Sequence, residues 1–273
     1  MNKGTYLEAD PGNSALVDDL SQALSRDEFF LVYQPTIDLE SNAFAGVEAL
    51  IRWRNPARGV VKPEMFIPEL EHSGLIASVG KWALDTACQQ GAVWHAKGYR
   101  FSVSVNISIK QLESPIFVDN VNDALASSRF DPALLVLEFS QEVLLTTGLA
   151  LNDTLSQLRG LGIHLAIDDF VPGVSSLTSL ERFPVDIIKL DRGFINGISS
   201  SPDNVELIHP LVVLGRSLNL LIVASGIEDI EQRRRLQGNE VRFGQGFLFS
   251  APHEAEQIDQ FLENFAIFSG KPL

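Results

Sequence analysis

The sequence predicts an α/β fold in which eight strands close into a TIM-like (β/α)8 barrel with an antiparallel first strand. Short apolar runs alternate with amphipathic helical stretches along most of the chain. Eight such runs with helices between them, within about 250 residues, are typical of a closed barrel. One early connection is too short to hold a helix, which indicates a hairpin. An open, doubly wound sheet is the alternative fold.

The expected elements begin at residue 14, where Leu16, Leu20 and Leu24 form one apolar stripe of a helix. Strands are expected at residues 31–36, 46–53, 101–108, 134–140, 163–169, 185–190, 220–225 and 245–249. Amphipathic stretches over residues 76–97, 149–159 and 228–236 are long enough to return the chain for a parallel neighbour. Residues 37–45 supply only a hairpin, which makes the first strand antiparallel.

The chain reads as a single domain over residues 14–265. Residues 1–13 contain Gly4, Pro11 and Gly12 without periodicity, so we interpret them as a tail or linker remnant. Residues 266–273 are expected to form a C-terminal tail. A sensory domain ahead of residue 14 in a longer parent chain is left open, as is a protein partner.

Composition and charge exclude some classes of function. The 273 residues carry 21 Lys and Arg against 35 Asp and Glu, and the net charge of −14 opposes general nucleic-acid binding. A small phosphorylated ligand remains compatible if local cations or metal ions hold it. The single cysteine, Cys88, excludes an internal disulfide, fits a reducing compartment and is expected to fill the core.

The most apolar window does not predict a membrane span. It covers residues 207–226, and His209, Pro210, Arg216 and Asn219 interrupt it. Residues 1–13 show no secretory signal. We therefore expect a cytoplasmic protein.

Polar side chains stand near the C-terminal ends of four expected strands: Glu48, Asn106, Glu138 and the adjacent pair Asp168 and Asp169. Barrel enzymes build their sites at this rim from several strands, so these groups are expected to converge. Oxygen ligands without histidine or thiolate suit Mg²⁺ or Mn²⁺ better than zinc. Asp169 could extend the site to a second ion, as in phosphodiester cleavage. The alternative is that each acid is a helix cap or ion-pair partner.

Short motifs occur in a fixed order over residues 20–255. They are Tyr33-Gln34-Pro35, Gly46-Val47-Glu48-Ala49-Leu50, Arg52-Trp53, Asn106-Ile107-Ser108, Leu137-Glu138, Asp168-Asp169-Phe170, Lys189-Leu190-Asp191 and Gln245-Gly246-Phe247-Leu248. In order and spacing they resemble the EAL family, whose domain hydrolyses the bacterial messenger cyclic di-GMP. The resemblance implies the same barrel with an antiparallel strand.

The resemblance also implies a role for each site residue. Glu48, Asn106, Glu138 and Asp168 would hold one divalent ion, Mg²⁺ or Mn²⁺, or Ca²⁺ bound without turnover, and Asp169 would help to hold a second. Lys189 would lie beside the attacking water, where its charge favours hydroxide and offsets phosphate charge. The residues that would bind the dinucleotide or order the site are Gln34, Leu50, Arg52, Asp191 and Gln245. A structural role is an equal alternative for Gln245.

One departure from the family pattern removes a carboxylate. The family's Ala-Glu-Gly-Val-Glu is Ala224-Ser225-Gly226-Ile227-Glu228 here, so Ser225 replaces the glutamate that the resemblance implies at the second ion and the water. A neutral hydroxyl is a poor substitute for a carboxylate as base or ligand. Glu228 remains as a candidate catalytic acid. Ser225 and Glu228 also fit a Ser-x-x-Glu capping box for the next helix, which we take as the role of Ser225.

A second departure changes the loop after Asp169. The family's Asp-Asp-Phe-Gly-Thr-Gly is Asp168-Asp169-Phe170-Val171-Pro172-Gly173 here, and valine at a positive φ would be strained. A third change places Gln141 where the family has the glutamate that anchors this loop. The loop is therefore expected to take another conformation. In relatives it orders the second ion and the dimer contact, so a homodimer is left open.

Three functions follow from these residues. The leading hypothesis is a receptor or effector of second-messenger signalling that binds cyclic di-GMP and has weak or absent phosphodiesterase activity. The alternative is an active phosphodiesterase that yields pGpG, with Glu228, Asp169 or Asp229 compensating for Ser225. The third is a protein-interaction module that no longer binds nucleotide.

Overall fold

The structure is a computed structural model that describes residues 11–172, 182–198, 202–265 and 267. The segments expected as tails, 1–13 and 266–273, fall mostly outside these residues. Helix α1 (Pro11–Ala23) begins ahead of residue 14, inside the segment expected as a tail. Among the described helices, none combines the length and the apolar character that crossing a bilayer requires.

Eight strands close into a barrel, as predicted, and the open-sheet alternative is wrong. Around the barrel the order is β1, β9, β8, β7, β6, β5, β4 and β2, and pairing of β1 with β2 closes it. Strand β1 is antiparallel to both of its neighbours, and the other barrel pairs are parallel. The strands are β1 (Phe29–Asp38), β2 (Phe44–Asn55), β4 (Ser102–Asn106), β5 (Leu135–Ser140), β6 (His164–Phe170), β7 (Ile187–Leu190), β8 (Leu221–Ala224) and β9 (Phe243–Gln245).

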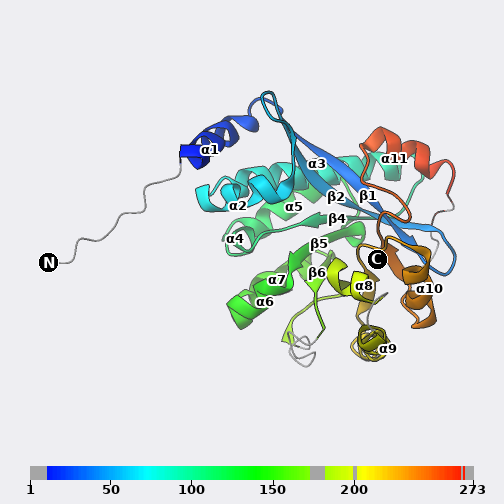
Figure 1. Cartoon of the computed structure of the whole chain (residues 1–273). Coiled ribbons are helices and arrows are strands. Elements are labelled where there is room, and N and C mark those ends of the chain that lie inside the picture. The colour runs from blue at the N-terminus through cyan, green and yellow to red at the C-terminus, as the bar shows by residue number, and fades with distance from the viewer. Residues whose placement is uncertain (1–10, 173–181, 199–201, 266, 268–273) are drawn as a thin grey trace.

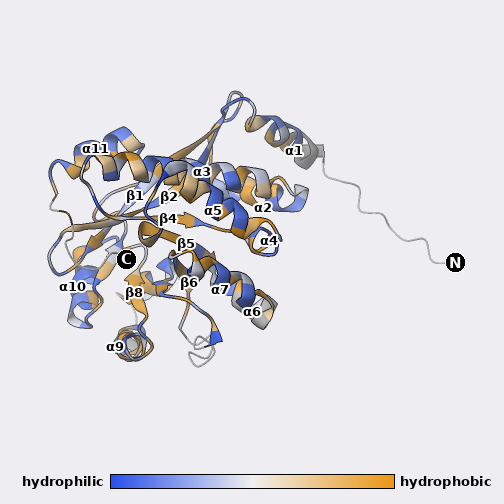
Figure 2. Ribbon diagram, turned by 180° about the vertical axis from the view of Figure 1, so that it is seen from behind, coloured by the Kyte–Doolittle hydropathy of each residue, from blue (hydrophilic) through white to orange (hydrophobic). Residues whose placement is uncertain are grey.

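Helices surround the strands (Figure 1). Figure 2 shows apolar colouring on β4 and β8 and a largely hydrophilic α10 at the surface. A short strand, β3 (Gly59–Val61), pairs with the end of β2 in the antiparallel sense and was not predicted. The helices are α2 (Pro63–Ser73), α3 (Ile76–Ala96), α4 (Ile109–Leu112), α5 (Phe117–Ser128), α6 (Gln141–Thr147), α7 (Asn152–Gly160), α8 (Arg192–Gly197), α9 (Pro202–Ser217), α10 (Ile230–Gly238) and α11 (Ala255–Leu262).

Alternating strand positions divide the core into two parts. One face of each strand packs against the helices, where Val103, Leu165 and Trp94 are fully buried. Cys88 of α3 belongs to this core, which confirms that it fills space. The other face forms a separate cluster inside the barrel, made of Ala45, Val136, Ala166, Ile187, Val223 and Phe243.

Two local predictions were wrong. The last strand, predicted over residues 245–249, ends at Gln245, because the backbone N–H groups of Phe249 and Ser250 both donate to the Gly246 carbonyl and form a turn. The capping box predicted for Ser225 and Glu228 does not form. Helix α10 starts at Ile230, and its capping box joins Asp229 and Gln232 through hydrogen bonds of 2.8 and 3.2 Å.

The predicted hairpin between β1 and β2 is held by a buried carboxylate. Asp38 accepts hydrogen bonds from the backbone of Ser41 at 2.7 Å and from Nε of Arg242 at 2.8 Å. Burial alone would raise the pKa of Asp38, but these hydrogen bonds and the Arg242 charge lower it below the ordinary value of 3.8. The ionised form therefore stabilises the fold.

Replacing Asp38 with asparagine is expected to change how stability depends on pH. Because the pKa of Asp38 is lower in the folded state, its contribution is complete above 3.8 and is lost as the pH falls through the folded-state pKa. The difference in unfolding free energy between wild type and Asp38→Asn should be constant at neutral pH and shrink below 3.8. Urea unfolding at several pH values measures it. The exposed Asp123→Asn is the control, and an equal shrinkage in both variants would contradict the prediction.

Candidate metal and nucleotide site

The predicted site residues form a polar layer at the C-terminal rim of the barrel. Each of Glu138, Asp168, Lys189, Ser225 and Gln245 follows a residue of the interior cluster by two positions, so the alternation of a strand places it one level above that cluster. Gln34 and Glu48 are paired neighbours on β1 and β2, and Asn106 ends β4 beside Glu138. We call these eight residues the rim layer.

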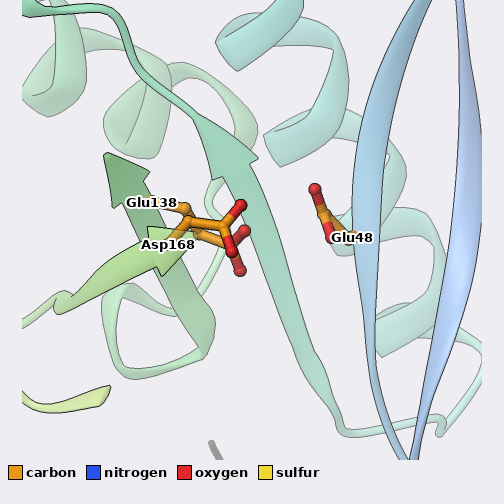
Figure 3. A group of neighbouring side chains, drawn as sticks. All are labelled: Glu48, Glu138 and Asp168. Atoms are coloured by element: carbon orange, nitrogen blue, oxygen red, sulfur yellow. The ribbon is translucent and has the colours of Figure 1, made fainter. Parts of the chain in front are cut away.

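Three carboxylates of the rim layer converge (Figure 3). Oxygens of Glu48, Glu138 and Asp168 all lie within 4.8 Å of one another, and the Glu138 and Asp168 carboxylates face Glu48 across the rim. The ammonium group of Lys189 stands among them. It donates to Glu48 Oε2 at 2.8 Å and to Glu138 Oε2, and it lies 3.7 Å from Asp168 Oδ1.

A hydrogen-bond chain fixes the position of Glu48. Asn106 Nδ2 donates to its Oε1 at 2.7 Å, and Gln245 Nε2 donates to its Oε2 at 2.9 Å. The same Gln245 nitrogen lies 2.9 Å from Gln34 Oε1, and Gln34 Nε2 donates to the Ser250 carbonyl at 3.2 Å. The part played by Ser250 could not be predicted from the sequence, because Ser250 contributes a backbone carbonyl and any residue type has one. Gln34 and Gln245 therefore order the site.

Burial and crowding of like charges shift the pKa values of these groups. Burial raises the pKa of Glu138 to about 8, against the attraction of Lys189. Burial also raises the pKa of Asp168, and it raises that of Asp169 to about 6 with help from the Asp168 charge. Although burial alone would raise the pKa of Glu48, Lys189 and the hydrogen bonds to Glu48 lower it. Three acids thus share one ammonium, which leaves their charge incompletely balanced.

The donor set fits a hard divalent ion. Carboxylate oxygens are the ligands that Mg²⁺, Mn²⁺ and Ca²⁺ prefer. Asn106 uses its amide nitrogen to bind Glu48, so its amide oxygen is available to an ion. Oxygens on opposite sides of one ion are about 4.2 Å apart for Mg²⁺ and about 4.8 Å for Ca²⁺. The separation of up to 4.8 Å therefore suits one ion held between Glu48, Glu138 and Asp168.

Ser225 occupies the place in the rim layer that follows β8. Its backbone N–H donates to the Leu190 carbonyl at 3.1 Å, which continues the pairing of β8 with β7. Its hydroxyl oxygen is buried and has no hydrogen-bond partner in the described part of the chain. The rim position that follows β8 therefore offers no carboxylate.

Glu228 and Asp191 interact with α8 and not with the three rim carboxylates. Glu228 forms an ion pair with Arg192 at the surface, where 39% of its side chain is exposed. Asp191 caps α8 by accepting a hydrogen bond from the Phe194 backbone at 2.9 Å. The structure thus does not bring Glu228 into the carboxylate group, and it gives Asp191 an ordering role.

The loop after Asp169 keeps an anchor to α6. Asp169 adopts a left-handed φ of 53°, whereas Val171 stays outside that region, so the expected valine strain does not arise. The Val171 N–H donates to Oε1 of Gln141 at 3.0 Å. Sequence reasoning took Gln141 as a lost anchor, and the structure corrects this, since an amide oxygen accepts this bond as a carboxylate would. Gly173 lies outside the described residues.

A cleft of about 560 Å³ opens beside the rim layer. Asn106, Glu138, Asp168 and Asp169 line it together with apolar side chains, including Leu50 of β2 and Ile67 of α2. Arg52 lies two residues beyond Leu50 on β2, half-buried, and donates to the Ile51 carbonyl at 2.8 Å. Its charge interacts with that of Glu64 and, more weakly, with that of Glu48. An apolar cleft with acids at one end can accept a base beside an ion-bound phosphate.

Comparisons with known proteins agree with this geometry. The EAL domain family model matches residues 17–252. MucR of Pseudomonas aeruginosa, a bifunctional diguanylate cyclase/cyclic di-GMP phosphodiesterase, is 39% identical over 89% of this chain. The signaling protein YkoW of Bacillus subtilis is 36% identical over 89% of this chain. The chain spans 36% of the length of MucR and 30% of YkoW.

Solved structures give the same result. A cyclic di-GMP complex of the PaMucR phosphodiesterase has a TM-score of 0.85 at 39% identity, covering 89% of this chain and 99% of that one. The EAL enzyme Bd1971, bound to cAMP and cyclic di-GMP, has a TM-score of 0.86 at 30% identity, covering 92% of this chain and 69% of that one. The chain belongs to the EAL domain family.

Proposed function

We propose that this chain binds cyclic di-GMP and one divalent ion at the rim layer and hydrolyses the nucleotide slowly or not at all. The single observation that carries the proposal is Ser225, a buried hydroxyl at the rim position where the family pattern has a glutamate. Relatives described as cyclic di-GMP phosphodiesterases and neighbours bound to that nucleotide support the ligand. Such a protein acts as a receptor in second-messenger signalling.

Different residues would bind the ion, offset the phosphate charge and accept a proton from water. When bound, Mg²⁺ or Mn²⁺ supplies Lewis-acid polarisation of a phosphate oxygen. Glu48, Glu138 and Asp168 hold the ion, and Lys189 offsets phosphate charge from the buried side of the site. Ser225 cannot accept a proton from water as a carboxylate does, and loss of a general base lowers rates by about 10²- to 10⁴-fold. We therefore expect the chain to retain cyclic di-GMP binding and to lose most of its hydrolysis.

A working phosphodiesterase that yields pGpG is the second candidate. Asp169 favours it, because its pKa of about 6 suits a group that accepts protons near neutral pH. The other two acids that could compensate are engaged elsewhere: Glu228 pairs with Arg192, and Asp229 caps α10. Their engagement supports the receptor over the enzyme.

Two measurements test the proposal. Calorimetric titration with cyclic di-GMP in the presence of Ca²⁺ should give heat of binding, and its absence with any divalent ion would favour a protein-interaction module instead. Chromatography after incubation with cyclic di-GMP and Mn²⁺ should show little pGpG. Turnover at ordinary enzymatic rates would reject the receptor and leave the phosphodiesterase.

Replacing Arg52 with alanine is expected to weaken cyclic di-GMP binding by roughly 10- to 100-fold, the value of a charge-assisted hydrogen bond to phosphate. Calorimetry should show a much smaller change in Ca²⁺ affinity, because Arg52 donates its hydrogen bond to the Ile51 carbonyl and not to a rim carboxylate. The matched control is Arg54→Ala on the same strand. Arg54 is exposed, and its Nη2 lies 3.3 Å from Oε1 of Glu254. Equal losses in the two variants would contradict a phosphate contact by Arg52.

A further inference from the structure

We propose that Lys189 is an internal cation that competes with the divalent ion for the rim carboxylates. In this role it stabilises the barrel before an ion binds, and it sets the ion affinity. The inference rests on the proposed function only in requiring that an ion binds Glu48, Glu138 and Asp168.

The contacts of Lys189 carry the inference. Its Nζ donates to Glu48 Oε2 at 2.8 Å and to Glu138 Oε2, and it lies 3.7 Å from Asp168 Oδ1. These are the same three residues whose oxygens could hold an ion. An ion at about 2.1 to 2.6 Å from oxygens of these carboxylates would bring two further positive charges close to an ammonium that is hydrogen-bonded to the same groups. Ion binding therefore weakens the interaction of Lys189 with at least one carboxylate.

Burial makes this competition strong. Only 4% of the Lys189 side chain is exposed, and only 3% of the Glu138 side chain. Charges in such surroundings are poorly screened, and a buried carboxylate that loses its only cation is strongly destabilising. Glu48 also receives hydrogen bonds from Asn106 and Gln245, so Glu138 depends on the ammonium more than Glu48 does.

Charge counting gives the direction of the effect. Around a bound ion the three carboxylates are ionised, and together with one ammonium they carry two net negative charges, which a divalent ion balances. Without the ammonium the same three carboxylates carry three negative charges around the ion, so the attraction for it rises. Removing Lys189 should therefore weaken the ion-free protein and tighten ion binding.

The test uses Lys189→Met without nucleotide, with Ca²⁺ as the probe. Calorimetry should show Ca²⁺ binding at least tenfold tighter than in wild type. The melting temperature without ion should fall by about 6 °C or more and recover in saturating Ca²⁺. The control is Lys81→Met, which removes a surface lysine paired with Asp85 at 2.7 Å and should change neither value by much.

A second variant keeps the test decisive if Lys189→Met folds only with Ca²⁺. Glu138→Gln combined with Lys189→Met removes one of the three charges, so it should be more stable without ion than Lys189→Met alone. Equal or weaker Ca²⁺ affinity in Lys189→Met would overturn the inference and leave the proposed function standing. Failure of wild type and variant alike to bind any divalent ion would overturn both.

Discussion

Replacing Ser225 with glutamate is expected to raise the rate of cyclic di-GMP hydrolysis by about 10²- to 10⁴-fold, the usual contribution of a general base. The hydroxyl oxygen of Ser225 is buried at the rim position that follows β8 and has no hydrogen-bond partner in the described part of the chain. A carboxylate introduced there stands on the same face as Lys189, on the neighbouring strand. Chromatographic quantification of pGpG with Mn²⁺ measures the effect.

Ser225→Gln is the matched control for this variant. Glutamine has the same shape as glutamate and lacks its charge and basicity, so hydrolysis should stay at the wild-type level. Calorimetry should show that both variants still bind cyclic di-GMP. If Ser225→Glu binds normally and hydrolyses no faster, the changed loop after Asp169 is the larger defect.

Replacing Gly246 with alanine is expected to lower the free energy of unfolding by about 3 kcal/mol or more. An added Cβ would lie 2.1 Å from the carbonyl oxygen of Ile227 and 2.2 Å from its nitrogen. Ile227 cannot move away freely, because its N–H donates to the Gln245 carbonyl at 2.9 Å and its carbonyl accepts from Leu248 at 3.0 Å. Chemical denaturation measures the loss.

The control for Gly246→Ala is Gly238→Ala at the end of α10. No heavy atom lies within 4 Å of a Cβ added at Gly238, so stability should change by less than about 0.5 kcal/mol or rise slightly. Gly246→Ala should also weaken Ca²⁺ binding, because it displaces Gln245 from Glu48. Wild-type stability of Gly246→Ala would show that the contact with Ile227 relaxes at little cost.

The barrel and most of the rim layer could be predicted from the sequence, because both depend on strand alternation. Glu138 and Lys189 stand at positions that local periodicity assigns to the inner face. The end of β9 could not be predicted, because Gly246 continues an apolar run whose pairing stops where it meets Ile227. The start of α10 could not be predicted either. Asp229 and Gln232 form a second capping pattern close to Ser225 and Glu228, and the sequence does not distinguish between the two.

Contacts between distant segments explain what else was missed. The bond from Val171 to Gln141 joins residues that are 30 positions apart, and the bond from Gln34 reaches the backbone of Ser250. Neither depends on a local pattern. The hydrogen bonds from Lys189 to Glu48 and Glu138 also required coordinates, because the sequence predicted only that Lys189 lies near the water and the phosphate.

The reversed direction of β1 decides from which end the polypeptide approaches the barrel. Phe29, the first residue of β1, pairs with Trp53 near the end of β2, so α1 leads into β1 on the same side of the barrel as the rim layer. Leu20 of α1 packs in one small core with Phe66 of α2, and the neighbouring Ile67 lines the cleft. Only a few side chains therefore separate α1 from the cleft, and a barrel whose first strand ran parallel to the others would be entered from the opposite end and lack this connection.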